Sequence, residues 1–211
     1  MAEARRVYLF DIDGTLVDAQ GMGGKAFRRA VREVLSHELG WQGRDFAGQT
    51  DAGLFNRILD ETGMHRGLLS DLYDRYHEYL AENLREKPAR ILPGVVDLLE
   101  QLSADANAEL GLLTGNTERG SGIKLAELSR YFDFGYYGDH FAERTQIGIA
   151  ARSELGARFG ASVELVIVGD TPNDIACARA AGAQCIAVAT GLYGAAELSA
   201  ADRVLADLTE W

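Results

Sequence analysis

The chain has 211 residues, of which 47% are hydrophobic and 25% are charged, as expected for a folded globular protein with room for a core and an insertion. Its formal charge of −11 would repel a phosphate backbone, which argues against nucleic acid as a partner. No apolar run approaches the ~18 residues of a membrane helix, and the start "MAEARR" lacks a signal-peptide segment. The sequence therefore predicts a cytoplasmic protein without membrane contact.

Cysteines and histidines give no sign of a metal or redox site. Cys177 and Cys185 are too few for a disulfide framework and are not a close-spaced pair suited to zinc. We expect both to be small buried residues of the core. The four histidines also lack metal-binding spacing, and we interpret them as surface or hydrogen-bonded residues.

The first expected element is a buried strand, because residues 7–10 read "VYLF". It carries two carboxylates, Asp11 and Asp13, to its C-terminal end. Two carboxylates a few ångströms apart repel by several kcal/mol at an effective dielectric of about 20, unless one is protonated or a cation lies between them. This strand end therefore calls for a chemical explanation.

Residues from about 22 to 87 are expected to be helical, with no strand. In "GGKAFRRAVREVLSHELG" the apolar positions recur at helical spacing, and we expect Gly40 to end this helix. A second helix begins after "GQTD", where Thr50 or Asp51 can cap it. A third helix carries leucines and tyrosines at helical spacing and ends before Pro88.

From Pro93 onward, expected helices alternate with short apolar strands. The strands are in "ELGLL", "FDFGYY", "VELVIV", "AQCIAVA" and "DRVLADL". This alternation predicts an α/β fold whose parallel sheet is covered on both faces. We expect residues 1–17 and 88–211 to form this core and residues 18–87 to form an inserted all-α domain.

The unusual residues of the chain lie where the expected strands end, and a parallel sheet places its site at the carboxyl ends of its strands. The residues at these ends are Asp11 and Asp13, Thr114 and Asn116, Asp139, and Gly169 with Asp170. We expect neighbouring strands to bring them to one edge of the sheet.

Carboxylates predominate among these residues, since Asp170 and Asp174 add to the repulsion between Asp11 and Asp13. A bound divalent cation is the simplest remedy, and an all-oxygen donor set favours Mg²⁺ over Zn²⁺. Any one of these aspartates alone is readily explained as a strand-end or helix-cap residue. Their combination predicts a magnesium site.

The segments "DIDGT", "LLTGN" and "VGDTPND" resemble the first, second and fourth motifs of the haloacid dehalogenase-like hydrolase superfamily. The resemblance covers nearly the whole chain. The order, the spacing and the helical insertion after the first motif are similar to members with an α-helical cap, such as phosphoglycolate phosphatase-like enzymes. It implies a Rossmann-like catalytic core with a parallel sheet, and a cap formed by residues 18–87.

The resemblance implies that Asp11 is a nucleophile that attacks phosphorus and forms an aspartyl-phosphate, which splits hydrolysis into two easier displacements. Asp13 would be the general acid for the leaving alcohol and then the base for the attacking water. The resemblance also implies a Mg²⁺ ion held by Asp11, the backbone carbonyl of Asp13 and Asp170, with Asp174 in support.

The second motif is expected to bind phosphate. By resemblance, Thr114 and the backbone N–H groups of Gly115 and Asn116 hydrogen-bond the phosphoryl oxygens. The alternative is an ordinary strand-to-helix turn, in which Asn116 or Thr117 only caps the next helix. Its place after a second parallel strand favours the phosphate role.

The third motif departs from the family pattern. Relatives usually place a lysine a few residues after a "GD" such as Gly138 and Asp139, but "GDHFAERTQ" has none, and Arg144 stands there instead. A guanidinium can neutralise Asp11 and the phosphate and can bind two oxygens at once. The alternative is a solvated arginine at the start of a helix.

In capped relatives the inserted domain closes over the site and contacts the leaving group of the substrate. Gln49, Thr50 and Lys25 are therefore possible substrate contacts in this chain. A helix cap and a solvated lysine explain them equally well, so we do not assign them a role from the sequence.

The sequence as a whole predicts a magnesium-dependent phosphatase for a small phosphorylated substrate, either phosphoglycolate-like or a sugar or nucleotide monophosphate, acting as a monomer or homodimer. A phosphomutase with the same intermediate and a non-catalytic domain that binds phosphate or protein are the alternatives. A dehalogenase and a phosphonatase are disfavoured, because neither needs an acid at Asp13. The helical insertion does not fit a phospho-acceptor receiver domain.

Overall fold

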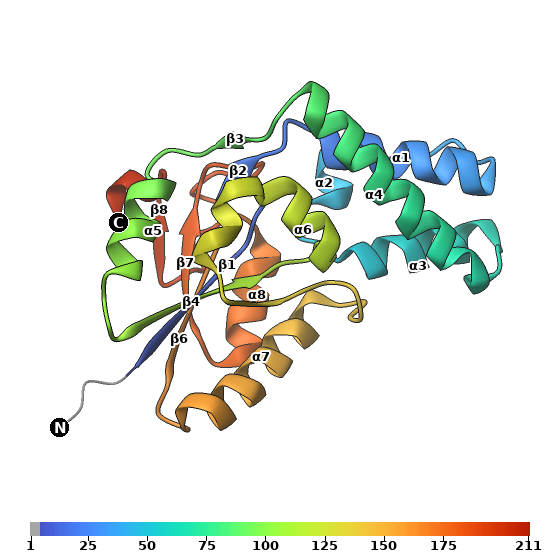
Figure 1. Cartoon of the computed structure of the whole chain (residues 1–211). Helices are drawn as coiled ribbons and strands as arrows, with labels where there is room; N and C mark the ends of the chain where they lie inside the picture. The colour runs from blue at the N-terminus through green and yellow to red at the C-terminus, as the bar shows by residue number, and fades with distance from the viewer. Residues whose placement is uncertain (1–4) are drawn as a thin grey trace.

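The computed structural model describes residues 5–211, and its centre is a sheet of six parallel strands in the order β5-β4-β1-β6-β7-β8 (Figure 1). The strands are β1 (Arg6–Phe10), β4 (Ala108–Leu113), β5 (Phe134–Tyr136), β6 (Glu164–Gly169), β7 (Gln184–Val188) and β8 (Arg203–Leu205). Phe10, the last residue of β1, lies opposite Leu112 of β4 and Val168 of β6. The strand ends are therefore level, and the predicted α/β fold is confirmed.

Successive side chains of β1 point to opposite faces of the sheet and pack into two separate layers of the hydrophobic core. Tyr8 and Phe10 belong to the cluster on one face of the sheet, and Val7 and Leu9 belong to the cluster on the other. Val7, Leu9 and Phe10 have no exposed surface. The continuous apolar run in the sequence therefore reflects burial on both faces, as in other covered parallel sheets.

Helices cover both faces of this sheet (Figure 1). One face is covered by α5 (Val95–Ser103), α6 (Glu118–Leu125) and the 3₁₀ helices η2 (Ala126–Tyr131) and η3 (Leu208–Glu210), and the other by α7 (Arg144–Phe159) and α8 (Pro172–Ala181). Helix α8 had not been singled out in the sequence. Cys177 and Cys185 are buried in the second layer, as expected.

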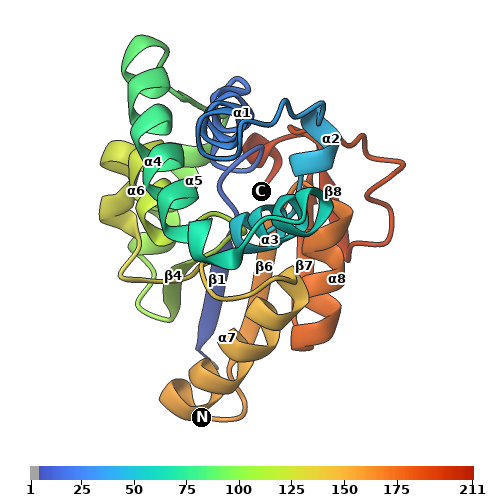
Figure 2. The ribbon, with the colours of Figure 1, turned by 90° about the vertical axis from the view of Figure 1, so that its right-hand side faces the viewer.

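The cap is a helical domain with a core of its own. It consists of α1 (Met22–Leu35), α2 (Gly43–Phe46), α3 (Asp51–Thr62), the 3₁₀ helix η1 (Arg66–Leu68) and α4 (Leu69–Glu86). The rings of Phe27 and Phe55 stack at its centre, with 4.4 Å between their centroids. Figure 2 looks onto this domain, with α5 and α6 to one side of the sheet and α7 and α8 to the other.

The expectation that Gly40 ends the first cap helix is wrong. Helix α1 ends at Leu35, because Ser36 takes a left-handed conformation with φ of 50°. Beyond it the chain runs without regular structure, and Leu39 and Trp41 pack back onto the aromatic centre of the cap. These apolar residues continue the apolar pattern of the helix without belonging to it.

The chain passes from core to cap and back through a short antiparallel ribbon. Strand β2 (Val17–Asp18) pairs with β3 (Arg90–Ile91), and the Arg90 guanidinium lies 2.5 Å from the Asp18 carboxylate. The division into residues 1–17 and 88–211 against 18–87 stays a prediction. No helix within residues 5–211 is both long and apolar enough to cross a membrane.

Candidate active site

The carboxyl ends of β1, β4 and β6 open into a cavity of about 490 Å³ between the core and the cap. It is lined from the core by Asp11, Asp13, Gly14, Thr114, Gly115, Asn116, Lys124, Arg144, Asp170, Thr171, Thr190, Gly191 and Leu192. From the cap and the connecting segment it is lined by residues that include Gly23, Phe27, Arg28, Phe46, Gln49, Asp51, Leu54 and Tyr76. The predicted residues of the strand ends therefore meet at one edge of the sheet, apart from Asp139.

Three carboxylates form a buried group, which we call the floor of this cavity, and two of them, Asp11 and Asp170, line it. Asp11, Asp170 and Asp174 each offer one oxygen, and these oxygens all lie within 4.8 Å of one another. Asp11 follows β1 and Asp170 follows β6, while Asp174 comes from the first turn of α8. There Thr171 and Asp174 cap the helix reciprocally, because the hydroxyl of Thr171 accepts from the backbone N–H of Asp174 and the Asp174 carboxylate accepts from that of Thr171.

Arg144 lies between two of these carboxylates. Its Nη2 is 2.9 Å from Asp11 Oδ1 and 2.5 Å from Asp174 Oδ1, and it also donates to the backbone oxygen of Leu113 at 3.2 Å. The side chain is about 5% exposed and extends from the first residue of α7. Arg144 is therefore a buried partner of Asp11, and the alternative of a solvated helix-start arginine is wrong.

The charges of this group do not balance. Three carboxylates and one guanidinium leave two negative charges when all are ionised, in a region where the aspartates are at most 4% exposed. Burial raises the pKa of Asp11 to about 6 although Arg144 opposes the shift. Burial and the neighbouring Asp174 and Asp11 also raise the pKa of Asp170 well above its usual range.

Asp170 has the features of a cation ligand. Its Oδ1 is buried and has no hydrogen-bond partner in the structure. Gly14 and Gly191 lie so close to the same carboxylate that a Cβ on either would overlap it. The unpaired oxygen, the two excess negative charges and the all-carboxylate donor set all fit a divalent cation, and they suit Mg²⁺ chemistry.

The second motif forms the turn that was expected after β4. The Thr114 hydroxyl accepts hydrogen bonds from the backbone N–H of Asn116 at 3.3 Å and from its side-chain amide at 2.8 Å. Thr117, and not Asn116, caps α6 by accepting from the backbone N–H of Gly120. Thr114 and Asn116 thus line the cavity without serving as the helix cap.

Asp139 does not join the cavity. Its carboxylate accepts a hydrogen bond from the backbone N–H of Glu118 at 2.9 Å, in the first turn of α6. This bond supports a helix start, where a negative charge is favourable. Among the predicted strand-end residues, Asp139 therefore has a local structural role.

Asp13 contacts a residue that the sequence analysis missed. Lys124 Nζ lies 2.5 Å from Asp13 Oδ2 and 2.6 Å from the side-chain oxygen of Asn116. The lysine is 6% exposed and belongs to the buried face of α6, with Gly120, Ser121 and Leu125. This spacing was the available signal, because small residues one turn earlier leave room for a lysine to turn inward.

The cap rests on the core through backbone contacts. The N–H of Asp51 donates to the oxygen of Gly115 at 2.7 Å, and the N–H of Ala52 donates to that of Gly138 at 3.2 Å. A Cβ on Gly115 would overlap the carbonyl oxygen of Gln49. The second and third motifs therefore touch the start of α3 directly.

Of the three possible substrate contacts in the cap, Gln49 lines the cavity. Thr50 is buried and caps α3 by accepting from the N–H of Gly53, and its hydroxyl donates to the backbone oxygen of Ala142 at 2.9 Å. Lys25 is exposed and does not line the cavity. The structural alternatives therefore explain Thr50 and Lys25.

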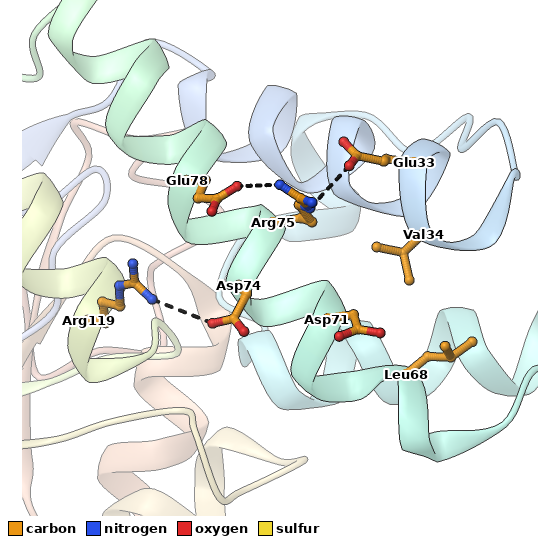
Figure 3. A pocket seen from close by; sticks show the side chains of 8 residues that line it. All are labelled: Glu33, Val34, Leu68, Asp71, Asp74, Arg75, Glu78 and Arg119. Carbon is orange, nitrogen blue, oxygen red and sulfur yellow. Dashed lines mark hydrogen bonds and ion pairs between the residues drawn. The ribbon is translucent and has the colours of Figure 1, made fainter.

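A second cavity of about 600 Å³ lies between α1, α4 and the start of α6 (Figure 3). Five of its six charged side chains have partners, since Arg75 contacts Glu33 at 3.1 Å and Glu78 at 2.7 Å, and Arg119 contacts Asp74 at 3.6 Å. These side chains are between 43% and 66% exposed. We interpret this groove as a surface with solvated ion pairs.

A model of the family described as haloacid dehalogenase-like hydrolase matches residues 8–188. The phosphoglycolate phosphatase of Chromobacterium violaceum is 33% identical to this chain over 204 residues, which span 90% of this chain and 88% of that protein. The phosphoglycolate phosphatase of Yersinia pestis is 30% identical over 208 residues, 92% of this chain and 85% of that protein. These proteins are similar to this chain over most of both lengths.

The fold is similar to that of CbbY from Rhodobacter sphaeroides, which was crystallised in complex with phosphate. The TM-score is 0.77 at 21% sequence identity, and the likeness covers 98% of this chain and 96% of the other. A predicted phosphoglycolate phosphatase from Haemophilus somnus has a TM-score of 0.74 at 21% identity, covering 100% and 97%. At such identities the likeness concerns the fold.

Proposed function

Because this chain belongs to the haloacid dehalogenase-like hydrolases and is a phosphatase, we propose that it hydrolyses a small phosphorylated metabolite through an aspartyl-phosphate at Asp11, with Mg²⁺ as cofactor. The substrate class is phosphoglycolate-like, or a sugar or nucleotide monophosphate. The observation that carries the proposal is the buried group of Asp11, Asp170 and Asp174 with Arg144 in contact with Asp11 at 2.9 Å.

Asp11 is suited to act as the nucleophile. It follows the central strand β1, its backbone N–H donates to Val168 at 2.9 Å, and its carboxylate lines the cavity. In the proposed first step, one Asp11 oxygen forms a bond to phosphorus while the bond from phosphorus to the leaving oxygen breaks. The Arg144 guanidinium holds the carboxylate in place and offsets the negative charge that the phosphoryl group brings.

Asp13 is proposed to move the protons. Its carboxylate is about 40% exposed. It lines the same cavity as Asp11, which precedes it by two residues in the chain. It gives a proton to the oxygen of the leaving alcohol in the first step. It then takes a proton from the water that attacks the aspartyl-phosphate, so that the second step releases inorganic phosphate, restores the Asp11 carboxylate and leaves Asp13 protonated for the next turnover.

Asp11, Asp170 and the backbone carbonyl of Asp13 would hold the Mg²⁺ ion, with Asp174 in support. When bound, the ion would supply positive charge beside the phosphoryl oxygens and would offset the two excess negative charges of the floor. Thr114 and the N–H groups of Gly115 and Asn116 are proposed to bind the remaining phosphoryl oxygens.

The cap side of the cavity is proposed to select the leaving group. Its lining combines aromatic side chains, among them Phe46 and Tyr76, with the polar groups of Arg28 and Gln49. Arg28 donates to the backbone oxygen of Trp41 at 3.1 Å, which fixes one end of its guanidinium. This lining fits a small, polar organic group better than a long or fully apolar one.

The test is phosphate release from a panel of phosphoglycolate, sugar phosphates and nucleoside monophosphates, each with Mg²⁺ and with EDTA. Asp11→Asn is the control, because the amide keeps the shape of the side chain and removes the nucleophile. We expect magnesium-dependent release that Asp11→Asn reduces by at least about 1000-fold while circular dichroism stays unchanged.

Two results would contradict the proposal. Full activity of Asp11→Asn would exclude the aspartyl-phosphate, and equal activity in EDTA would exclude the metal. Transfer of the phosphoryl group between sugar positions without phosphate release, followed by ³¹P NMR, would favour the phosphomutase.

A further inference from the structure

Lys124 is the one buried lysine among the three in this chain, and the proposed reaction gives it no role. Its ammonium contacts Asp13 Oδ2 at 2.5 Å, and the amide of Asn116 donates to the same oxygen at 2.9 Å. The side-chain oxygen of Asn116 in turn accepts from Lys124 at 2.6 Å, so each of the three side chains is hydrogen-bonded to the other two. Two donors therefore fix one oxygen of a carboxylate that is otherwise open to the cavity.

The cap surrounds the other side of this lysine. Asp51, in the first turn of α3, is 6% exposed, and its carboxylate accepts from the backbone N–H of Thr117 at 2.9 Å. Attraction to Lys124 opposes the effect of burial on the pKa of Asp51. On α1, a Cβ added to Gly23 would lie 3.4 Å from Lys124 Nζ. The lysine thus fills the space between the cap and Asp13.

A buried ammonium is costly unless it is well paired, and an apolar side chain of similar volume often gives equal or better stability at such a place. Packing alone therefore does not account for a lysine here. What the ammonium adds is a fixed position for the Asp13 carboxylate, since both of its donors on Oδ2 come from the core.

We propose that Lys124 is a positioning residue that holds the Asp13 carboxylate in the place from which it exchanges protons with the leaving oxygen and the attacking water. The proposal rests on the proposed function, because it requires Asp13 to be the acid and base of the reaction. It assigns Lys124 no contact with substrate. Loss of the lysine releases Asp13 into other rotamers and slows both proton transfers. Phosphate binding by Arg144, Thr114 and the backbone N–H groups of the second motif is kept, because Lys124 contacts only the side chain of Asn116 there.

The test is a double-mutant cycle on kcat with the best substrate of the panel, using Lys124→Met, Asp13→Asn and the double variant. We expect Lys124→Met to lower kcat by about 10- to 100-fold with less than about a threefold change in KM, as part of the 10²–10⁴-fold effect of an acid–base group. In the Asp13→Asn background the same change should lower kcat by less than about twofold, because there is no proton transfer left to position.

Lys87→Met is the matched control, since Lys87 is exposed at the end of α4 and should leave kcat unchanged. If Lys124→Met unfolds the protein, Lys124→Gln replaces it in the cycle. Equal losses in both backgrounds would identify a purely structural lysine and overturn the proposal. An inactive wild-type enzyme would overturn the proposed function and this role together, whereas an active enzyme without coupling would overturn the role of Lys124 alone.

Discussion

The core and the cap contribute to the cavity in different ways. The core places titratable side chains at the ends of two strands and at the start of α7, and Asp11, Asp170 and Arg144 are all nearly inaccessible to solvent. The cap meets the core through main-chain groups, such as the N–H of Asp51 on the oxygen of Gly115, and through side chains at the surface and around the start of α3, such as the Thr50 hydroxyl on the oxygen of Ala142. Charge therefore determines the chemistry of the floor, and close contact at the start of α3 contributes to how the cap covers it.

Removal of the Arg144 charge should give the largest effect on the core side. Arg144→Met leaves Asp11 and Asp174 facing each other without a cation, and breaking a buried ion pair typically costs about 3–5 kcal/mol. We expect the free energy of unfolding in EDTA to fall by about that amount and kcat to fall at least about 100-fold. Urea titration and steady-state kinetics measure the two effects.

Arg144→Lys is the informative partner of this variant, because it keeps the charge and gives the residue that the family resemblance leads us to expect there. A lysine has one point charge in place of the fork, so we expect it to recover most of the stability but to remain about tenfold slower. Equal activity of the lysine variant and the wild type would show that a point charge is sufficient there. Wild-type stability of Arg144→Met would contradict the charge balance of the floor.

A single methyl group at Gly115 should be enough to disturb the contact between the second motif and the start of α3 in the cap. Gly115→Ala places a Cβ against the carbonyl oxygen of Gln49, so the start of α3 must move away from the second motif. Displacements of about 1 Å at an active site can cost about 100-fold in rate, and we expect a loss of that order in kcat/KM. The kinetics should be measured with a small substrate, beside thermal unfolding of the same variant.

Gly156→Ala is the control for this substitution, because Gly156 lies inside α7 with no atom near its Cβ position. There the extra methyl group should stabilise the protein by about 0.5–1 kcal/mol without changing the rate. A Gly115→Ala variant with the kinetics of Gly156→Ala would mean that the cap does not rest on the second motif during turnover.

The same contrast explains what the sequence could predict. The α/β fold followed from apolar strands alternating with helices, and the strand-end positions of Asp11, Thr114 and Asp170 followed from the parallel sheet. Their roles in catalysis and metal binding stay predictions. The positions could be predicted because charged or polar residues directly after apolar runs are easily recognised in a sequence.

The contacts between the cap and the core were not predictable in the same way. Gly115 touches Gln49 through main-chain atoms, which look alike at every position of a sequence. Lys124 stands between Ile123 and Leu125 in a helix, and only the small residues one turn earlier hint that it turns inward. The end of α1 was misplaced because Gly40 is a typical helix-ending residue, whereas the chain leaves the helix at Ser36, a non-glycine residue in the left-handed conformation.

The smallest expected effect concerns the one carboxylate that the cap buries against the core. Burial raises the pKa of Asp51 from 3.8 to about 6, so its folded form binds a proton more tightly than its unfolded form. The resulting stabilisation is fully present below about pH 3.8 and is lost as the pH rises through about 6. Above that pH the ionised Asp51 lowers the stability of the protein.

Asp51→Asn removes this pH dependence. A shift of about two pKa units, which already includes the attraction to Lys124, corresponds to at most about 3 kcal/mol, and the Asn amide is itself a polar group that must be buried, so we expect the variant to be about 1 kcal/mol more stable at pH 7. Urea titrations at pH 4 and pH 7 measure the difference, which should nearly vanish at pH 4. A variant that is less stable than the wild type at pH 7 would mean that the favourable interactions of the Asp51 carboxylate outweigh the cost of burying its charge. In that case charge, as well as backbone contact, would hold the cap on the core.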